Sequence, residues 1–492
     1  MNCAKNLPST WTVATIAEVT HVRTGKLDAN AAVNDGQYPF FTCAEEISRI
    51  DSYSFDTEAV LLAGNGFFGL KWFKGKFDAY QRTYVIEPVG ISGRFLYYSF
   101  LSLIPEIAKK SRGSTIKYLR LGDIEDTKLA LAPDAEQARI VEKLDELLSG
   151  LDASVAELKA AQKKLARYRQ SLLKAAVEGA LTAEWRAERA RRGKSTESGA
   201  QLLARILAER RTRWEAKQLA KFKEQGKAPP KDWEDKYPEP VQLDTTHLPE
   251  LPDDWVWASL DQLVGSSSYG TSVKCSYESG GVPVLRIPNV VARSISLEDV
   301  KFATQELELE ASDYLDIGDI LVVRTNGSIN LMGRAAEIVS ALPQKCYFAS
   351  YLLRLRCVEP NTVPSWISSV LAAKRGRMWI ESKAASSAGQ HNISLSTLLS
   401  MPIPLAPLLE QIETFQFLSI QLNCVIDQEK AVAVSLKQAT AQRKNILKAA
   451  FSGQLVPQDP NDEPASILLE RIRAEREKLV ESRKGKTRKV RA

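Results

Sequence analysis

The sequence lacks the residue patterns on which most metal sites, disulfide frameworks and membrane spans depend. Its six cysteines are unevenly spaced and include no Cys-x-x-Cys pair, which argues against a zinc site and against a secreted disulfide scaffold. Only three histidines occur, and no second ligand or catalytic partner stands at a suitable spacing from any of them. We interpret His21, His247 and His391 as ordinary loop or surface residues.

Long apolar runs and nucleotide-binding motifs are also missing. No apolar stretch approaches the ~20 residues of a membrane span, and the N-terminus has no charged segment followed by an apolar core. The chain contains no G-x-x-x-x-G-K-[ST] motif and no Asn-Pro-Pro-Tyr/Phe stretch. These absences predict a cytoplasmic protein and give no support to an enzyme.

The molecule as a whole has little excess charge of either sign. The net charge of +6 is a small difference between 66 basic and 60 acidic side chains, so the overall field is only weakly positive. Any attraction to an anion must therefore be local. The length of 492 residues predicts roughly three domains rather than one.

What the chain does contain is an internal repeat. Segments 131–137 and 169–181 resemble segments 405–411 and 443–455, and both pairs are offset by 274 residues. The openings Leu7-Pro-Ser-Thr-Trp11 and Leu251-Pro-Asp-Asp-Trp255 are offset by 244 residues. The segment between the opening and the similar segment that follows it is therefore 30 residues longer in the second copy. A further similar pair, 201–206 and 467–472, trails each copy. The equal intervals indicate a constant frame, and the unequal ones indicate two independent domains.

The equal intervals carry a heptad pattern of apolar residues. The residues of the expected helix–helix seam are Leu144, Leu148, Leu151, Leu158, Leu165, Leu172, Leu418, Leu422, Val425, Val432, Leu436 and Ile446. They predict two long helices within 131–182 and 405–456, each about 45 residues and roughly 70 Å long. We expect the two helices to pair antiparallel about a pseudo-twofold axis. The alternative is that each helix packs only against its own domain.

Polar and capping residues refine this expectation. Gln162, Arg169, Glu429 and Arg443 interrupt the seam, and polar residues at such positions often fix the register. Asp134 with Gln137 resembles a capping box at the start of the first helix. Gly179 and Gly453 stand where a glycine would end each helix.

The unequal segments, 1–130 and 251–404, are predicted to be α+β domains. Runs of β-branched and aromatic residues predict strands at 38–42, 59–63, 83–86, 282–286, 319–324 and 347–353. Helices are expected at 95–109 and 364–382. The charged linker 183–250 is expected to be helical at first and then extended up to Pro240. Segment 457–492 is expected to form a helix and then an irregular basic tail from Arg483 to Arg491.

Basic residues concentrate locally in the first domain. Between Phe67 and Arg120 there are ten basic residues and three acidic ones, interleaved with aromatic residues. This pattern is typical of a phosphate footprint, and a solvated face over an ordinary core is the alternative. The candidate DNA-binding residues here are Lys71, Lys74, Arg82, Arg112, Ser114, Thr115 and Lys117.

The second domain carries side chains that suit base edges. Arginine pairs bidentately with guanine, and asparagine or glutamine with adenine. The candidates, on predicted loops, are Arg286, Arg324, Asn326, Arg334, Gln390, His391 and Asn392. Most of these are expected to be surface or turn residues instead.

Together these features resemble the specificity subunit of type I restriction-modification enzymes. The residues that carry the resemblance are the two Leu-Pro-x-x-Trp openings, Gly113-Ser-Thr-Ile-Lys-Tyr-Leu119, Gly389-Gln-His-Asn-Ile-Ser-Leu395, Met401-Pro-Ile-Pro-Leu-Ala-Pro-Leu-Leu-Glu-Gln411 and the two Lys-Ala-Ala-x-x-Gly-x-Leu helix ends. The resemblance implies two target recognition domains, each reading half of a split DNA site, with two long antiparallel coiled-coil helices between them.

The resemblance also implies partners and cofactors. Double-stranded DNA, two modification subunits and the restriction subunits would be the partners. S-adenosylmethionine, ATP and Mg²⁺ would be bound by those subunits, and this chain would bind no cofactor and catalyse no reaction. The alternatives are a coiled-coil adaptor that does not touch DNA, and a fused DNA methyltransferase or nuclease.

Overall fold

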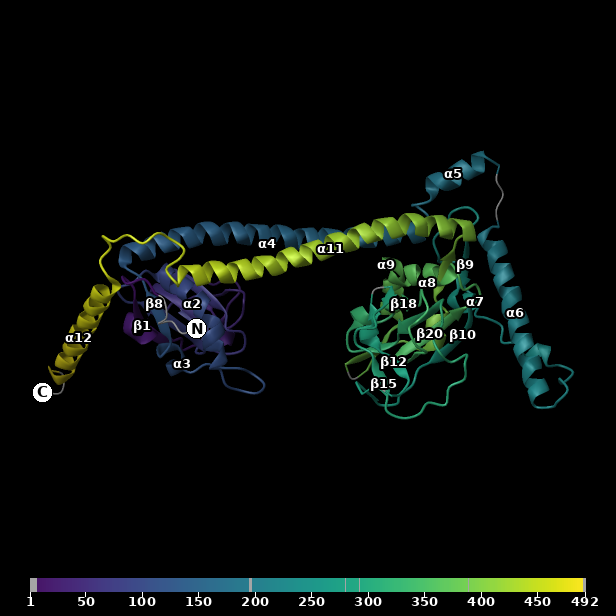
Figure 1. The fold of residues 1–492 in the computed structure, drawn as a ribbon, viewed down its shortest axis with the longest axis horizontal. Helices are drawn as coiled ribbons and strands as arrows, with labels where there is room; N and C mark the ends of the chain where they lie inside the picture. The colour runs from purple at the N-terminus through teal and green to yellow at the C-terminus, as the bar shows by residue number, and fades with distance from the viewer. Residues whose placement is uncertain (1–6, 194–196, 279, 292, 388, 490–492) are drawn as a thin grey trace. The chain divides into compact units, whose positions relative to one another are not determined.

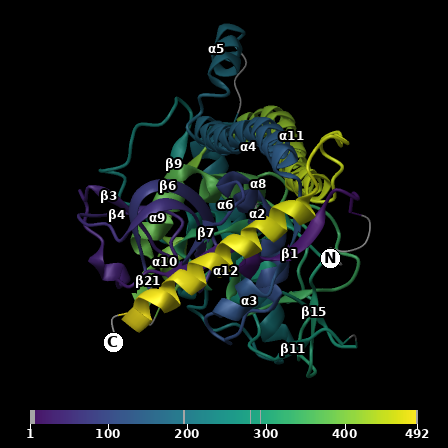
Figure 2. The same ribbon diagram turned by 90° about the vertical axis from the view of Figure 1, so that its left-hand side faces the viewer.

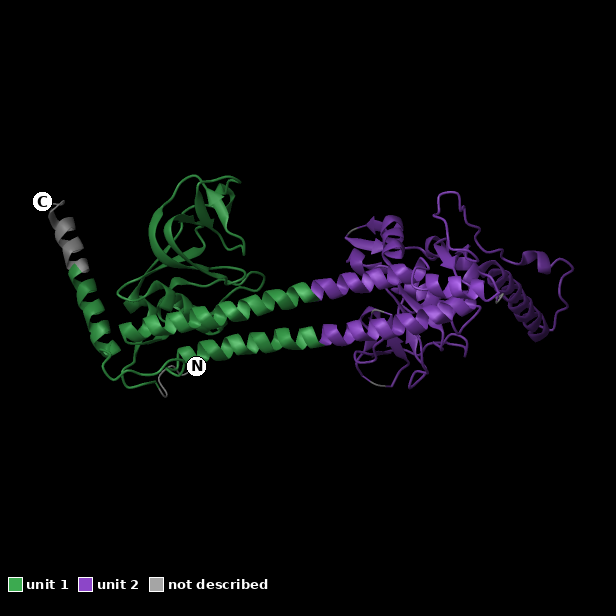
Figure 3. Cartoon of the chain, turned by 90° about the horizontal axis from the view of Figure 1, so that it is seen from above, with its two compact units in different colours: residues 1–161, 431–492 green, residues 162–430 purple. Residues whose placement is uncertain are grey.

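The computed structural model describes residues 7–193, 197–278, 280–291, 293–387 and 389–489. The chain forms two compact units, unit 1 from Met1–Ala161 with Ala431–Ala492 and unit 2 from Gln162–Lys430 (Figure 3). Cys3 lies outside the described residues, and the other five cysteines are free thiols. Within the described ranges, every helix is too short or too polar to cross a membrane.

Unit 1 includes helices α2 (Gly93–Lys109) and α3 (Leu121–Glu125), both labelled in Figure 1. It is built on a six-stranded sheet of order β2-β7-β5-β6-β3-β4. The strands are β2 (Thr20–Thr24), β3 (Tyr38–Phe41), β4 (Ser48–Ile50), β5 (Phe55–Ala63), β6 (Leu70–Ala79) and β7 (Thr83–Pro88). All neighbours are antiparallel except β3 and β6. Helix α2 (Gly93–Lys109) packs on the sheet through Phe95, Leu96 and Phe100, which are fully buried. The short elements are η1 (Ala29–Ala31) and α3 (Leu121–Glu125).

Unit 2 contains two four-stranded sheets, β10-β20-β16-β18 and β11-β15-β12-β19. Their strands are β10 (Val264–Tyr269), β11 (Cys275–Ser276), β12 (Pro283–Leu285), β15 (Lys301–Ala303), β16 (Asp319–Val323), β18 (Ala335–Glu337), β19 (Tyr347–Phe348) and β20 (Leu352–Cys357). Two smaller sheets pair β13 (Val290–Val291) with β14 (Ser294–Ile295), and order β17 (Thr325–Asn326), β22 (Gln390–Asn392) and β21 (Ala385–Ser387). The remaining short elements are η2 (Glu234–Lys236), η3 (Ile287–Asn289), η4 (Ile329–Leu331) and α10 (Leu395–Leu399). The mixture of sheets and helices confirms the α+β class.

Two single elements expected in the second domain are each divided in two, so those predictions were wrong. The strand expected at 347–353 is β19 and β20, because a turn at Ala349 moves the chain from one sheet to the other. The helix expected at 364–382 is α8 (Val363–Ala372) and α9 (Lys374–Lys383). Ala373 between them is extended, and Gly376 lets α9 approach α8 so closely that a Cβ there would lie 2.0 Å from the Val370 carbonyl oxygen.

The linker and the C-terminal segment are more helical than expected. Helices α5 (Ala183–Arg191) and α6 (Gly199–Glu224) occupy the linker, and the irregular connection begins only at Gln225. Helix α12 spans Ala465–Lys489. Most of the expected irregular tail is therefore helical, and the last three residues lie outside the described ranges.

The two long helices, α4 (Asp134–Val177) and α11 (Leu408–Ala450), each contribute residues to both units. All twelve residues of the expected seam are buried or half-buried. In unit 1, Leu144 and Leu148 join one core with Leu447. In unit 2, Leu172 joins another core with Leu418. The helices therefore bury the seam against each other and, near their ends, against the domains.

Polar contacts show that the helices run antiparallel within each unit. In unit 1, Asp152 pairs with Arg443, while Glu136, earlier in the chain, accepts a hydrogen bond from Gln458 beyond the end of α11. In unit 2, Arg169 Nη2 lies 2.6 Å from Glu429 Oε2, while Arg186, later in the chain, pairs with Glu410 near the start of α11. Three of the four polar residues that interrupt the apolar pattern thus form ion pairs, whereas Gln162 is exposed.

The start of α4 differs from the expected capping box. The helix begins at Asp134 itself, so the N-cap position belongs to Pro133 and Asp134 cannot act as the capping residue. Gln137 instead donates from Nε2 to the Ala132 carbonyl oxygen at 3.0 Å. The helix ends are as predicted, since Gly179 and Gly453 have φ values of 76° and 70°, a left-handed conformation that glycine adopts without strain.

A buried junction of the same design opens each domain. The indole Nε1 of Trp11 donates to Glu136 Oε2 at 2.9 Å, and that of Trp255 donates to Glu410 Oε2 at 2.9 Å. Beside these bonds, β1 (Thr12–Thr15) pairs with β8 (Lys128–Leu131), and β9 (Val256–Ser259) pairs with β23 (Pro402–Leu405). Burial raises the pKa of Glu136, although hydrogen bonds from Trp11 and Gln458 oppose this effect.

The end of each repeat packs on the opening of the other one. A Cβ on Gly453 would lie 2.3 Å from Pro8, and a Cβ on Gly179 would lie 2.8 Å from Pro252. The helices that trail each repeat also pack on the opening of the other repeat. Helix α12 contacts α1 (Ile16–Val19) and β1, whereas α6 contacts α7 (Leu260–Leu263) and β9. Figure 2 shows α12 beside β1. Each domain is therefore completed by residues from both repeats.

We expect Trp255→Phe to lower the free energy of unfolding by about 1–3 kcal/mol, because it leaves the buried Glu410 carboxylate with one donor fewer. Trp257→Phe is the matched control, since the half-buried Trp257 donates its indole N–H to the Pro249 carbonyl in a hydrogen bond that is exposed. Urea unfolding followed by circular dichroism measures both. Equal losses in the two variants would show that the buried hydrogen bond is not the cause.

Candidate nucleic-acid interface

Two loops of unit 1 lie side by side and form a projecting surface. They are segment 64–69, between β5 and β6, and segment 112–118, between α2 and α3. The Gly66 amide donates to the Lys117 carbonyl at 2.8 Å, and the Leu119 amide donates to the Gly64 carbonyl at 2.9 Å. Within the second loop, Arg112 and Tyr118 exchange two backbone hydrogen bonds. These bonds give the loops a defined conformation without a regular strand.

The loop pair brings four of the predicted DNA-binding residues together, namely Arg112, Ser114, Thr115 and Lys117, all of which are exposed. Arg112 Nη1 also pairs with Asp123 Oδ2 at 2.7 Å. Burial acts to raise the pKa of Asp123, but hydrogen bonds from the Arg120 amide and the Arg112 side chain outweigh it and lower the pKa. The Asp123 carboxylate therefore holds the Arg112 guanidinium in a fixed position.

Two large apolar side chains project from the same loops. Phe67 is 76% exposed and Ile116 is 61% exposed, the largest values among the large hydrophobic residues of the described part of unit 1. Apolar side chains that remain in water beside hydroxyl and ammonium groups are typical of a binding surface. Ile116 was missed as a candidate in the sequence, where its position between two small hydroxyl residues and a lysine was the only signal.

The other basic residues of the first domain do not form one footprint. Lys74 and Arg82 are exposed. Lys71 donates to the Ala44 carbonyl at 2.6 Å, and burial lowers its pKa. Arg94 stacks on the Trp72 ring at 5.0 Å and pairs with Asp145. Lys110 donates to Thr127 Oγ1 at 2.9 Å. The expected patch of ten is therefore smaller, because several of its members satisfy internal acceptors.

In the second domain, the small sheet β17-β22-β21 gathers most of the predicted candidates. Its register places Asn326 opposite His391 and Thr325 opposite Asn392. Asn392 Oδ1 accepts hydrogen bonds from Thr325 Oγ1 at 2.8 Å and from Arg324 Nη2 at 3.3 Å. Gln390 is exposed on the same sheet. Amide, imidazole and guanidinium groups, which suit base-edge recognition, thus lie on or beside one small sheet. Because side chains alternate along a strand, His391 and Asn326 lie on the opposite face from Gln390 and Asn392.

Arg324 is held by an aromatic side chain that was not predicted. Its guanidinium lies 4.7 Å from the centre of the Tyr269 ring, and Tyr269 is 44% exposed. A cation–π contact orients the planar guanidinium and leaves its edge accessible. Tyr269 ends a run of three serines, so no local pattern marked it as a partner of Arg324.

Two candidates of the second domain lie outside this cluster. Arg286 Nη2 pairs with Asp299 Oδ2 at 3.0 Å and donates to the Asp299 carbonyl at 2.9 Å, so it holds its own loop together. Arg334 lines a cavity beside α4 and α11. Neither residue joins the sheet that carries Asn326 and Gln390.

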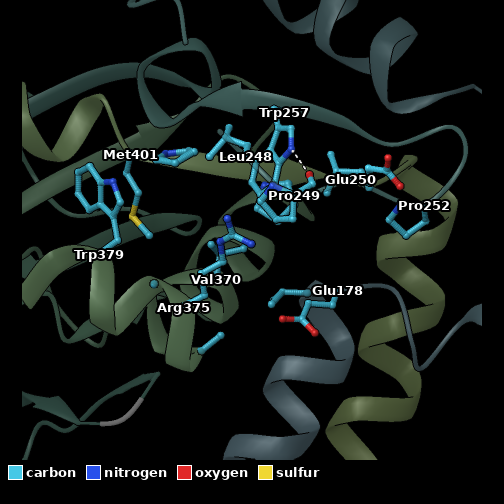
Figure 4. Close-up of a pocket in the computed structure, with 16 residues that line it drawn as sticks. Glu178, Leu248, Pro249, Glu250, Pro252, Trp257, Val370, Arg375, Trp379 and Met401 are labelled. Carbon is cyan, nitrogen blue, oxygen red and sulfur yellow. Dashed lines mark hydrogen bonds between the residues drawn. The ribbon is translucent and has the colours of Figure 1, made fainter. Parts of the chain in front are cut away.

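The described residues also line an apolar pocket of about 430 Å³ in unit 2 (Figure 4). Trp257, Trp379, Met401 and Pro249 form much of its wall. Arg375 enters the same pocket and stacks on the Trp257 ring at 5.2 Å. No group of three or more histidine, cysteine or carboxylate side chains suited to a metal ion occurs in the described part of the chain. The exposed loops therefore remain the better candidate site.

Comparisons with family models, known proteins and solved structures all find the same family of proteins. The family model of the type I restriction modification DNA specificity domain matches residues 8–161. The type I restriction enzyme EcoDI specificity subunit of Escherichia coli is 34% identical over 96% of this chain and 97% of that protein. The EcoKI specificity subunit of E. coli strain K12 is 25% identical over 82% of this chain and 76% of that protein. A solved chain from a structural study of complex assembly and conformational transition of the type I R-M system has the same fold. Its TM-score is 0.56, at 15% identity over 91% of this chain and 99% of that chain.

Two glycines allow a matched test of the loop pair. Gly113→Ala should disturb segment 112–118, because φ is 99° there and the new Cβ would lie 2.2 Å from the Ile116 carbonyl oxygen. Gly66→Ala, at φ 70° with open space around it, adds only the backbone strain, about 1–2 kcal/mol. Hydrogen exchange should therefore accelerate at Tyr118 much more in Gly113→Ala. Similar exchange in both variants would contradict the described loop geometry.

Proposed function

Because this chain belongs to the family of type I restriction enzyme specificity subunits, we propose that it is the DNA sequence-recognition subunit of a type I restriction-modification complex. One observation carries the proposal. The two domains share the same buried Trp–Glu junction, yet their exposed loops present different side chains. A repeated anchor with unlike exposed surfaces suits a subunit whose domains each read one half of a bipartite DNA site.

The exposed side chains divide into two roles. Lys74, Arg82 and Lys117 would neutralise phosphates, which contributes affinity for all sequences alike. Arg324, Asn326, Gln390 and His391 would contact base edges from the second domain. In the first domain, Ser114 and Thr115 would donate or accept hydrogen bonds at base edges, and Ile116 would contact apolar groups such as a thymine methyl.

The long helices would set the spacer between the half-sites and dock the two modification subunits. Helix α11 exposes large apolar side chains on its outer surface, including Phe417 at 46%, Ile420 at 68% and Val434 at 55%. Such residues on a helix that is already paired favour a further protein partner. The restriction subunits would join the complex of specificity and modification subunits.

The subunit itself would be non-catalytic and would hold no cofactor. S-adenosylmethionine, ATP and Mg²⁺ would be bound by the partner subunits. Neither a coiled-coil adaptor nor a fused methyltransferase or nuclease is favoured, because the similarity to a specificity subunit covers nearly the full length of both chains.

Replacing residues 251–404 with the equivalent segment of another specificity subunit should change only one half of the recognised sequence. The reason is that this segment supplies all the candidate base contacts of the second domain. Sequencing of duplexes selected from a randomised pool, by the chain together with modification subunits, measures the outcome. Replacement of residues 12–130 is the reciprocal control, and a change in both halves after either exchange would contradict modular reading.

Inserting one heptad into both α4 and α11 at paired positions should lengthen the spacer. One heptad adds about 10 Å of helix, which corresponds to about three base pairs. The same selection experiment reads the spacer directly. A heptad in α4 alone breaks the seam and should abolish assembly, and an unchanged spacer in the double insertion would refute the role of the helices.

A further inference from the structure

A second cavity of unit 2, of about 490 Å³, lies where α4 and α11 meet the second domain. Its polar wall includes Arg293, Arg334 and Glu337, and its apolar wall includes Leu173, Leu371 and Leu422. The size and the mixture of walls are those of a small-molecule site. We call it the arginine cavity.

Arg293 is the unusual member of this wall. Its Nε atom is buried without a hydrogen-bond partner, and burial lowers the pKa of its guanidinium. Four other arginines in the described residues have a similarly enclosed Nε, namely Arg169, Arg286, Arg324 and Arg354. Each of those four bonds through another guanidinium nitrogen. For Arg293, no nitrogen of the side chain has a hydrogen-bond or ion-pair partner within the described part of the chain.

The backbone at Arg293 is also strained. Its φ is 69°, in the turn that connects β13 and β14, where glycine or asparagine is usual. The Arg293 amide donates to the Ala335 carbonyl at 3.2 Å, which ties the turn to the neighbouring strand. A strained arginine whose Nε is enclosed, and whose guanidinium has no hydrogen-bond partner in the described residues, is costly to the folded state. Such features concentrate at binding sites.

The charges around the cavity leave positive charge unbalanced. Arg169 is paired with Glu429, and Arg377 donates to the Ile329 and Asn330 carbonyl oxygens. Arg334, like Arg293, forms no side-chain hydrogen bond or ion pair with the described residues. The single carboxyl in the wall, Glu337, accepts a hydrogen bond from Ser365. Burial raises the pKa of Glu337, although the charge of Arg293 acts against this rise. One carboxyl therefore faces two guanidinium groups that have no ion pair, those of Arg293 and Arg334.

The pocket of Figure 4 provides the contrast. Its arginine, Arg375, stacks on the Trp257 ring and is therefore satisfied by the protein itself. The arginine cavity has no aromatic ring in its wall. Its two guanidinium groups thus require a partner from outside, and an oxyanion suits them because the planar fork binds carboxylate or phosphate bidentately.

We propose that the arginine cavity binds a small organic anion, with one phosphate or carboxylate group on Arg293 and Arg334 and an apolar body against Leu173, Leu371 and Leu422. The occupant would contact α4, α11 and the second domain at once and would stabilise unit 2 by mass action. Arg334 was a DNA-binding candidate in the sequence, but no residue of the cavity wall is among those assigned above to phosphates or base edges, so the proposal does not depend on the proposed function.

Isothermal titration of the full chain with phenyl phosphate tests the proposal. Inorganic phosphate and phenol, titrated separately, represent the anionic and the apolar half of this probe. We expect saturable binding of phenyl phosphate, tighter than that of either half, and a rise in the unfolding temperature. Arg293→Gln should weaken binding about ten- to a hundredfold, the usual effect of losing a hydrogen bond to a charged group. Arg375→Gln, which removes the same charge from the other pocket, should leave binding unchanged.

A second variant keeps the proposal testable if Arg293→Gln fails to fold. Ala372→Phe would fill the apolar side of the cavity and should weaken phenyl phosphate binding without removing a charge. The proposal is overturned if phenyl phosphate does not bind, if Arg293→Gln binds it as tightly as the parent chain, or if a cognate DNA duplex displaces it. Loss of DNA binding with retained phenyl phosphate binding would count against the proposed function alone.

Discussion

The hydrogen bond from a buried tryptophan to a buried glutamate is the interaction on which both units depend. A carboxylate removed from water is costly unless donors surround it, so the segments that supply the donors must assemble together. In unit 1 these donors are Trp11 and Gln458, and in unit 2 they are Trp255, Thr182 and Arg186. The domain opening, the helix start and the end of the other repeat are thereby joined at one point.

This arrangement frees the remainder of each domain to vary. The junction, the two-stranded sheet beside it and the helix seam supply a rigid base, and the loops beyond it carry the exposed side chains. In unit 1 the base supports the loops with Phe67 and Lys117, and in unit 2 it supports the small sheet with Asn326 and Gln390. Recognition residues placed on loops above a fixed scaffold can change without loss of the fold.

The sequence revealed what repeats or has a regular period. The helices, their seam and their glycine ends followed from heptad spacing and from the equal offsets, and most strands followed from local composition. Contacts between distant residues were not readable. The pairing of Arg286 with Asp299, the cation–π contact of Arg324 with Tyr269, and the helix break at Ala373 each depend on a neighbour that only the folded chain brings close.

The completion of unit 1 by both ends of the chain has a consequence for synthesis on the ribosome. Unit 2 is continuous from Gln162 to Lys430, so all of its core is available once that stretch has emerged. Unit 1 begins to emerge first, yet its core includes Leu447, Leu469 and Ile472. The domain translated first is therefore the last to close, and it must wait with part of its apolar surface uncovered until the segment through Ile472 has emerged.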